Sequence, residues 1–222
     1  MKIDKLYLDF KKFSNNNIVS IVTKKLFTQS KENIFNSLNI SEDKIAKCTQ
    51  IHSNNVKYVS LAGNYENVDG LISNLANNIF LQIVTADCIP VFMFDDSNGN
   101  IGLLHSGWKG TCKSIIKNGI DIFIHRGSKV NNIKIMLGPS IKSCCYEIQK
   151  DVSALFNKEY VIISNNKQYL DMNAKIRDDL LMLGINKKNI FISNICTYED
   201  EEFHSYRREG KDAGRIYSII GL

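Results

Sequence analysis

Two apolar segments separated by a dense turn signal constrain the fold of this chain more than any other feature. Residues 89–94 and 101–105 are rich in Ile, Leu, Val and Phe and have the length of β-strands. Between them, residues 95–100 read DDSNGN, a run of residues that favour turns. The pattern predicts an antiparallel hairpin, and another apolar run at residues 80–85 predicts a strand just before it.

The hairpin brings two reactive side chains together. If Asp95 pairs roughly with Ile101, then His105 faces Val91 to within a residue or two, and Cys88 lies just beyond, at the same open end. A thiol and an imidazole that are 17 positions apart in the sequence are thereby placed within side-chain reach of each other. Small and polar neighbours flank both residues, which leaves room for a ligand to approach.

Three roles for this pair follow from the residue types. The thiolate and the imidazole can be two ligands of a zinc ion, with His52, which lies between two strand-like runs, as the third; three protein ligands leave one position open, as in catalytic zinc sites. Alternatively, Cys88 can be a nucleophile with His105 as its base and Asp87 or a backbone carbonyl as the orienting group. The third role is structural, a buried Cys and a hydrogen-bonded His. The two residues alone leave all three open.

The remaining periodic segments predict a mixture of strands and helices. Strands are expected at residues 18–22, 47–50, 56–61, 133–137, 160–163 and 189–192, and helices at residues 30–38, 114–125, 147–156 and 171–183. Such an order needs both hairpin and helix-crossover connections, which predicts mixed β-sheets packed with helices, the α+β class. Because the chain has 222 residues and neither a repeat nor a long linker, we expect a single domain over residues 1–222.

Composition narrows the expected location and partners. No apolar run approaches the roughly 18–20 residues of a membrane-spanning helix, and the N-terminal MKIDK has no apolar stretch behind it, so we expect a cytoplasmic protein without a membrane partner. The net charge of +5 comes from scattered basic residues, which argues against nucleic acid and is compatible with a small anion such as phosphate. Of the six cysteines, all but Cys88 are interpreted as reduced, structural thiols, with one of the adjacent Cys144 and Cys145 buried and the other facing outward.

Several motifs resemble, in the same order, those of one family. Residues 85–91 (TADCIPV) and 105–111 (HSGWKGT) are similar to the TADC-x-PV and HAGW-[RK]-G motifs of the YfiH-type family, also named a multicopper polyphenol oxidase (laccase) domain family and, later, a purine nucleoside phosphorylase family. Further agreement lies around His52 and at residues 69–72, 138–141, 145–148, 196–197, 203–208 and 214–215. The resemblance covers about residues 48–222, whereas residues 23–30 (TKKLFTQS) lack the glycines of the family's R-x-G-G-V-S loop.

The resemblance implies a YfiH-like fold and a single metal ion held by His52, Cys88 and His105, which would then also be the catalytic residues. The ligand types favour zinc, with copper as the less favoured metal. The reactions implied are phosphorolysis of adenosine, inosine, guanosine and methylthioadenosine, and deamination of adenosine, so the partners would be purine nucleosides and phosphate. One alternative is a Cys-His amidase that edits a peptidoglycan precursor; copper-dependent polyphenol oxidation is disfavoured because the chain has only four His.

Three basic residues in these motifs form the predicted substrate-binding set. Lys109, Arg207 and Arg208 can each contact a phosphate or ribose oxygen, and one of the two arginines, placed at an expected strand end, is interpreted as structural. Asp87 is expected either to accept a hydrogen bond from a ligating His or to hold a turn. Trp108 is expected to pack in the protein rather than to stack on a purine.

Overall fold

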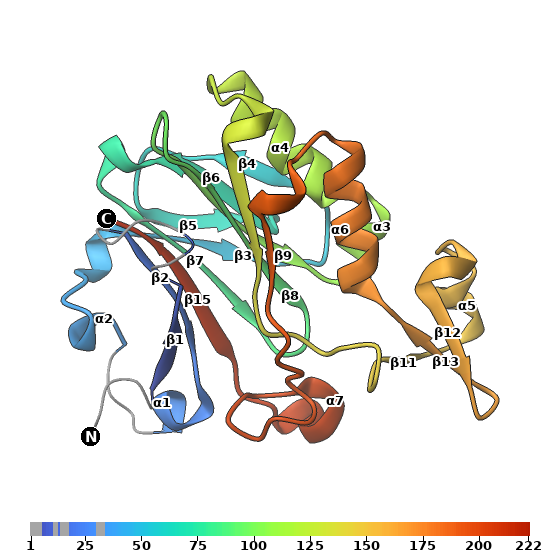
Figure 1. Cartoon of the computed structure of the whole chain (residues 1–222). Helices are drawn as coiled ribbons and strands as arrows, with labels where there is room; N and C mark the ends of the chain where they lie inside the picture. The colour runs from blue at the N-terminus through green and yellow to red at the C-terminus, as the bar shows by residue number, and fades with distance from the viewer. Residues whose placement is uncertain (1–5, 11–12, 14–17, 30–33) are drawn as a thin grey trace.

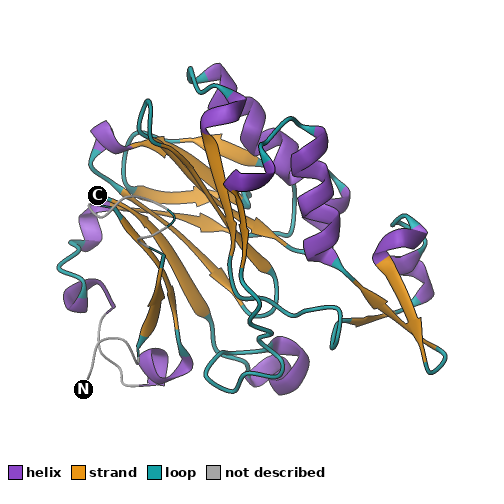
Figure 2. Ribbon diagram, viewed as in Figure 1, coloured by secondary structure: helices purple, strands orange, loops and turns teal. Residues whose placement is uncertain are grey.

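The computed structural model describes residues 6–10, 13, 18–29 and 34–222. Over these residues the chain forms two six-stranded β-sheets, a three-stranded sheet and several helices (Figure 1, Figure 2). Both large sheets contain parallel as well as antiparallel strand pairs. The predicted α+β class, with mixed sheets packed with helices, is therefore confirmed.

The first large sheet brings the two ends of the described chain together. Its strands run in the order β1 (Tyr7–Asp9), β2 (Val19–Thr23), β15 (Ile216–Gly221), β7 (Phe80–Thr85), β3 (Ile45–Thr49) and β5 (Gly63–Glu66). The C-terminal strand β15 pairs antiparallel with both β2 and β7. The short helices α1 (Lys25–Gln29) and α2 (Ile34–Ser37) follow β2 in the chain, and Phe27 of α1 packs against the sheet beside Ile21 and Ile219.

The second large sheet carries the predicted hairpin. Its strands run in the order β14 (Ile190–Ile192), β10 (Ile133–Leu137), β8 (Ile89–Asp95), β9 (Asn100–Ser106), β6 (Gly70–Asn74) and β4 (Val56–Tyr58). Strands β8 and β9 pair antiparallel, as expected, with Asp95 opposite Asn100. His105 therefore lies opposite Pro90, one residue from the expected Val91. The hairpin is confirmed, and its open end carries Cys88 and His105.

Alternating side chains of β8 and β9 build two cores. Leu103 points into the core between the two large sheets, and the next residue, Leu104, points into the core beneath the helices. Those helices, α3 (Trp108–Cys112), α4 (Ile115–His125) and α6 (Met172–Met182), cover the outer face of the second sheet (Figure 1). Gly102 lets α4 approach closely, because a Cβ there would lie 2.9 Å from the Phe123 ring. Among the described residues, no helix has the length and apolar character needed to cross a bilayer.

A three-stranded sheet extends from one side of the molecule, at the right in Figure 1. It contains β11 (Glu147–Ile148), β13 (Lys167–Leu170) and β12 (Val161–Ser164), with α5 (Lys150–Ser153) beside it. The prediction of a helix over residues 147–156 is therefore wrong at both ends, and only Lys150–Ser153 is helical. Glu147 and Ile148 pair with β13 instead, and Ile148 is buried in the core beneath the helices. Tertiary contact overrides the local helical pattern here.

Two other expectations need comment. Of the helix predicted over residues 30–38, only residues 34–38 are described, and α2 spans Ile34–Ser37 of them. Arg207 and Arg208 do not end a strand, as expected; they lie in the short helix α7 (Tyr206–Glu209). Ser205 caps this helix by accepting a hydrogen bond from the backbone N–H of Arg208, which satisfies a donor of the first turn.

Candidate metal centre

Three segments of the chain bring His52, Cys88 and His105 together. His52 lies in the loop between β3 and β4, Cys88 in the turn before β8, and His105 near the end of β9. Their ligand atoms all lie within 4.8 Å of one another, and Cys88 Sγ is 4.0 Å from His52 Nε2. The two imidazole rings meet edge to face, with centroids 4.7 Å apart. The structure thus brings together the three side chains predicted as metal ligands.

Gly107 makes this meeting possible. A Cβ at this position would lie 3.1 Å from Cys88 Sγ and 3.1 Å from His52 Cδ2. Few contacts of real Cβ atoms are that short, so a side chain here would require the Cys88 thiol and the His52 ring to shift by a few tenths of an ångström. Gly107, between the end of β9 and the start of α3, therefore leaves the space in which the two side chains converge.

Asp69 holds both histidines in place. Its buried carboxylate accepts hydrogen bonds from the backbone N–H of Ile51, His52 and Ser53 and from the Ser53 hydroxyl, at 2.6 to 3.2 Å. The same carboxylate lies 2.8 Å from His105 Nδ1, so Nδ1 carries the proton and Nε2 is left as the ligand atom. These bonds also stabilise His52 in the left-handed backbone region, at φ 58°.

The centre is buried on one side and open on the other. His105 is only 2% exposed, Cys88 is half-buried and His52 is exposed. A tetrahedral zinc centre places neighbouring N and S ligand atoms about 3.3–3.6 Å apart, close to the 4.0 Å between Cys88 and His52. One thiolate and two imidazoles are ligands that suit zinc. The donor set therefore fits a metal with one position left open toward the cavity.

The metal-free centre carries charge on Cys88 and His105. Burial acts to raise the pKa of the Cys88 thiol, but hydrogen bonds with His105 and His52, and their positive charge, outweigh it and lower this pKa to about 7. Burial acts to lower the pKa of His105, but its hydrogen bonds to Asp69 and Cys88, and their negative charge, raise it to about 9. The pair therefore tends toward a thiolate beside an imidazolium. The thiolate is the form that binds metal, and binding would release the His105 proton.

Burial also acts to raise the pKa of Asp69, but the hydrogen bonds from His105 and Ser53 outweigh it and lower this pKa to about 2. Asp69 therefore stays ionised at neutral pH. It supplies the negative charge that balances His105 when no metal is bound.

A cavity of about 520 Å³ opens onto the three side chains. This volume lies within the range of small-molecule sites. Arg207 lines the cavity, and its guanidinium carbon lies 5.5 Å from the centre of the Tyr146 ring. Besides these, the lining consists of Cys48, Gln50, His52, Val84, Thr85, Ala86, Asp87, Cys88, His105, Trp108, Ile141, Tyr206 and Arg215. The cavity thus combines a metal-binding wall, aromatic rings and a cation that can meet an anionic group.

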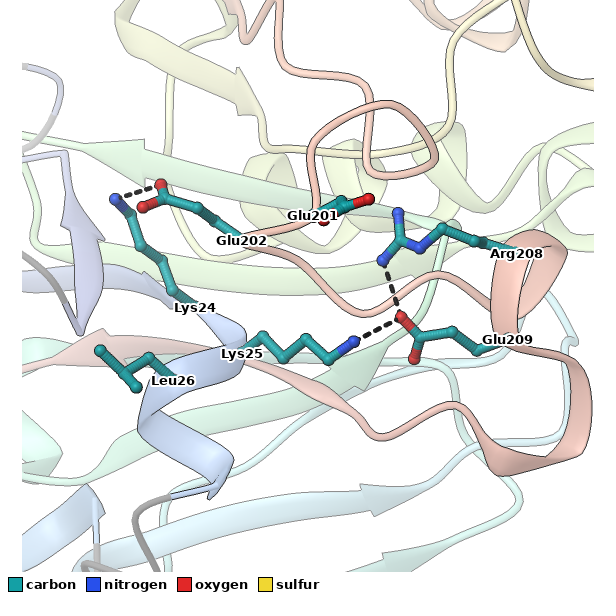
Figure 3. Close-up of a pocket in the computed structure, with 7 residues that line it drawn as sticks. All are labelled: Lys24, Lys25, Leu26, Glu201, Glu202, Arg208 and Glu209. Carbon is teal, nitrogen blue, oxygen red and sulfur yellow. Dashed lines mark hydrogen bonds and ion pairs between the residues drawn. The ribbon is translucent and has the colours of Figure 1, made fainter.

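The sequence predicts Lys109, Arg207 and Arg208 as substrate-binding residues. Of these, only Arg207 lines the cavity. The Arg208 guanidinium donates to the carbonyl oxygens of Thr197, Tyr198 and Phe203 and to the Glu209 carboxylate. It lines a separate cavity of about 740 Å³, where Lys25 also contacts Glu209 (Figure 3). Arg208 is therefore held by backbone carbonyls and by Glu209, outside the cavity that Arg207 lines.

Lys109 is exposed, with its ammonium 5.5 Å from the centre of the Trp108 ring. Trp108 itself is half-buried against the core beneath the helices and also lines the metal-side cavity. The indole therefore packs, as expected, while one side of it faces the space where a ligand would lie.

Asp87 holds a turn rather than a histidine. Its carboxylate accepts hydrogen bonds from the Thr197 hydroxyl and from the backbone N–H of Arg207, each at 2.7 Å. Its own backbone is left-handed, at φ 84°. Of the two roles considered for Asp87, the structure supports the turn. By joining the Cys88 turn to α7, it fixes where Arg207 enters the cavity.

Sequence reasoning did not identify Asp69 as the partner of His105, nor Arg215 as a residue of the cavity wall. Both lie in motifs that carry the family resemblance, residues 69–72 and 214–215. That position in a motif was the one signal that could have found them, because neither is close in sequence to the ligands they neighbour.

Comparison with known proteins finds one matching family and several relatives at 31–35% identity. Residues 20–222 match the family described as multi-copper polyphenol oxidoreductase laccase. A purine nucleoside phosphorylase of Deinococcus radiodurans is 31% identical over 84% of this chain and 73% of its own length. Purine nucleoside phosphorylase Cj1217c of Campylobacter jejuni is 35% identical over 86% of this chain and 83% of its own length. Adenosine deaminase RL5, from an unknown prokaryotic organism, is 32% identical over 70% of this chain, and the match spans 62% of the deaminase.

Solved structures agree on the fold. Hypothetical protein YfiH of Bacillus licheniformis superposes with a TM-score of 0.87 at 24% identity, over 98% of this chain and 97% of that protein. YlmD of Geobacillus stearothermophilus gives a TM-score of 0.84 at 24% identity, over 92% and 91% of the two chains. The YfiH-like fold expected from the sequence motifs is confirmed.

Proposed function

Because this chain belongs to the multi-copper polyphenol oxidoreductase laccase family, and its relatives include proteins named purine nucleoside phosphorylase and adenosine deaminase, we propose that it is a zinc-dependent enzyme of purine nucleosides. In this proposal it cleaves adenosine, inosine, guanosine and methylthioadenosine with phosphate, and it deaminates adenosine. The observation that carries the proposal is the open three-ligand centre in the wall of a 520 Å³ cavity that also holds Arg207.

The two reactions share one chemical demand. Phosphorolysis replaces the bond from ribose C1′ to the base with a bond to a phosphate oxygen, giving the free base and ribose 1-phosphate. Deamination replaces the amino group at purine C6 with the oxygen of water, giving inosine and ammonia. In both, an oxygen nucleophile displaces a nitrogen group from carbon. A zinc ion held by His52, Cys88 and His105 would supply Lewis acidity that favours such an attack near neutral pH.

The protein's own residues set the geometry around that centre. Asp69 keeps His105 Nε2 turned toward Cys88 and the cavity. Arg207 offers a planar, permanently charged group that can hold a phosphate with two hydrogen bonds. Tyr146 and Trp108 line the same cavity and offer apolar faces to a purine. A nucleoside and phosphate would thus meet between the metal side and the Arg207 side.

The side chains of His52, Cys88 and His105 fit a single zinc ion better than a centre of several copper ions. In the described part of the chain, the only ligand cluster that contains histidine is that of His52, Cys88 and His105. Oxidases with several copper ions need many more imidazoles than this. The family's older name therefore does not describe the chemistry that we propose for this chain.

The first test is chromatography of the products formed from adenosine by zinc-loaded protein, with and without phosphate. We expect adenine only when phosphate is present, inosine also without it, and loss of both after chelation. If adenosine stays unchanged while elemental analysis shows zinc in the protein, the proposal is wrong.

One rival function is favoured by a specific observation. The tendency of Cys88 and His105 toward a thiolate–imidazolium pair also suits a cysteine nucleophile. The corresponding enzyme would be a hydrolase or amidase that edits a peptidoglycan precursor. Under that alternative, chelation leaves activity intact while alkylation of Cys88 destroys it, so the two functions give opposite results with a chelator.

Replacement of Arg207 by alanine is expected to raise the KM for phosphate by roughly 10- to 100-fold, the value of losing a charged hydrogen bond of about 1.5–3 kcal/mol. Deamination of adenosine, which uses no phosphate, should change much less. The substitution keeps the backbone N–H of residue 207, which donates to the Asp87 carboxylate. The turn that Asp87 holds should therefore stay in place. Steady-state kinetics of both reactions measure this difference.

Lys109→Ala is the matched control. Lys109 is also one of the predicted substrate-binding cations, but its side chain is exposed and does not line the cavity. The substitution should leave the KM for phosphate unchanged. An equal rise of KM in both variants would mean that general positive charge, and not the Arg207 side chain in the cavity, attracts phosphate.

A further inference from the structure

Three thiols and one carboxylate converge at a second place in the molecule. Cys144 Sγ lies 3.3 Å from Cys145 Sγ and 3.7 Å from Cys196 Sγ. With a carboxylate oxygen of Glu199, the ligand atoms of the four residues all lie within 4.8 Å of one another. None of these residues belongs to the centre formed by His52, Cys88 and His105. All four were interpreted from the sequence as structural or left without a role, so their convergence calls for an explanation.

The four side chains come in pairs from two loops. Cys144 and Cys145 lie in the turn before β11, and Cys196 and Glu199 lie in the turn between β14 and α7. Cys196 and Glu199 are separated by two residues, which is the ligand spacing common in zinc sites. Two ligands from each of two facing turns is an arrangement that a metal ion can bridge.

The residue types and the distance across the two turns fit zinc, whereas the adjacent Cys144 and Cys145 sulfurs, 3.3 Å apart, would move apart slightly to share the ion. With Zn–S bonds of about 2.3 Å, two thiolates of a tetrahedral zinc site lie about 3.8 Å apart, and the 3.7 Å between Cys144 and Cys196 agrees with this. Thiolates select zinc over magnesium and calcium, and the carboxylate completes four ligands. We propose that Cys144, Cys145, Cys196 and Glu199 form a second, structural zinc site.

The surroundings suit such a site. Cys196 is buried, whereas Cys144 and Glu199 are exposed, so the ion can enter from solvent and still reach a buried ligand. Lys142 is a neighbouring cation. It lies two residues before Cys144 in the sequence. A positive charge here offsets part of the excess negative charge of three thiolates and a carboxylate.

The proposed ion would clamp two walls of the cavity. Cys145 immediately precedes Tyr146, which lines the cavity. Cys196 immediately precedes Thr197, whose hydroxyl donates to Asp87 beside Cys88. Bridging the two turns therefore fixes Tyr146 relative to the Cys88 turn. Because all four positions are filled by the protein, this site has no open coordination position and is not catalytic.

The test is a metal titration of the whole protein under reducing conditions, after chelation and removal of the chelator. Zinc stoichiometry is measured by elemental analysis, and Co²⁺ is used as a visible probe whose thiolate charge-transfer absorption grows with the number of thiolate ligands. We expect two equivalents in the wild type. The Cys144→Ser/Cys196→Ser variant should bind one. Cys88→Ser should also bind one equivalent. Its Co²⁺ absorption should be stronger than that of the Cys144→Ser/Cys196→Ser variant, because three thiolates rather than one bind the ion.

Cys112→Ser is the matched control, because it removes a half-buried thiol outside both clusters and should keep two equivalents. If the Cys144→Ser/Cys196→Ser variant does not fold, Glu199→Gln replaces it in the test, because Glu199 is exposed. Added to Cys88→Ser, this change should weaken the multi-thiolate Co²⁺ absorption relative to Cys88→Ser alone. Two equivalents retained by a folded double variant, or no metal bound by Cys88→Ser, would overturn the proposal. So would a count of four rather than six thiols in the denatured, metal-free protein prepared without reductant, since that indicates a disulfide instead.

The site also makes stability depend on zinc. In the Cys88→Ser background, where only the second site remains, the thermal midpoint should rise with zinc concentration, because an ion that binds only the folded protein stabilises it. The same titration of the variant that also carries Cys144→Ser and Cys196→Ser should show no rise. A rise of equal size in both proteins would count against the site.

Discussion

Replacing Cys88 by alanine is expected to remove one zinc equivalent from the protein and to abolish phosphorolysis and deamination together. The substitution removes the thiolate that lies 4.0 Å from His52 Nε2 and leaves two imidazoles to hold the ion. Without the thiolate, the tetrahedral set loses its one anionic ligand. Loss of a Lewis acid that contributes several kcal/mol to the transition state corresponds to about 10³-fold or more in kcat/KM.

Elemental analysis and product chromatography on the same preparations measure both effects. Cys48→Ala is the matched control for zinc content, because Cys48 is a half-buried thiol that lines the same cavity without belonging to the ligand cluster. Burial, together with the charge of Asp69, raises the pKa of Cys48 to about 12, so it stays a neutral thiol and should not hold metal. Its alanine variant should keep the zinc.

The possible results separate the functions considered. A folded Cys88→Ala protein that keeps its zinc and its rates contradicts the metal centre. Zinc content that is unchanged while all activity is lost points to Cys88 as a nucleophile instead. Loss of one zinc equivalent together with both reactions is the result expected from the proposed function.

The hairpin explains why part of the centre was predictable. Strands β8 and β9 are neighbours in sequence, and a short turn sets their register, so the approach of Cys88 and His105 follows from local pairing alone. The offset of one residue, which lies within the predicted range, arises because the turn is tighter than assumed, with Asp95 paired to Asn100. Asp95 also accepts hydrogen bonds from the backbone and hydroxyl of Ser97, which stabilises this tighter turn.

The residues that were not found depend on pairing between distant segments. Strand β6 was not predicted, because its five residues begin with Gly and its side chains enter both cores, Leu71 between the sheets and Ile72 beneath the helices. Such a strand lacks the alternation of a half-exposed one. Yet β6 pairs with β9 so that Gly70 faces Leu104, and one step further along this ladder Asp69 reaches His105. The partner of His105 follows only once β6 is known.

The same reasoning applies at the end of the chain. Strand β15 lies between β2 and β7, and no local signal specifies its pairing with β2, almost 200 residues earlier, or with β7. Arg215, just before β15, reaches the cavity as a result of this pairing. Motif resemblance indicated that this segment matters, but only the three-dimensional arrangement shows what it contacts.

Replacement of Asp69 by asparagine is expected to weaken zinc binding by about 10- to 100-fold, the usual effect of losing the hydrogen-bond partner of a metal-bound histidine. The amide keeps the size of the carboxylate but presents an NH₂ group either to His105 Nδ1–H or to the N–H groups of residues 51–53. At least one buried donor is then left without an acceptor, and the charge is lost. The free energy of unfolding of the metal-free protein should fall by roughly 2–4 kcal/mol.

Zinc affinity is measured by competition with a chelator of known affinity, and stability by urea denaturation of the metal-free protein. Two separate readouts are needed because a residue that only stabilises the fold would lower the unfolding free energy and leave the zinc affinity of the folded protein unchanged. Asp69 is a positioning residue, and it should affect both. Excess zinc should then restore much of the activity of the variant, since the three ligands are still present.

Asp87→Asn separates the contact with His105 from a general effect of charge. Asp87 is next to Cys88 and its carboxylate is also fully hydrogen-bonded, but its partners are Thr197 and the backbone of Arg207. Removing its charge should therefore leave zinc affinity unchanged. Equal losses of affinity in Asp69→Asn and Asp87→Asn would mean that negative charge near the centre, rather than the hydrogen bond at 2.8 Å to His105 Nδ1, sets the affinity. A loss confined to Asp69→Asn would show that the carboxylate acts by fixing which nitrogen of His105 faces the metal.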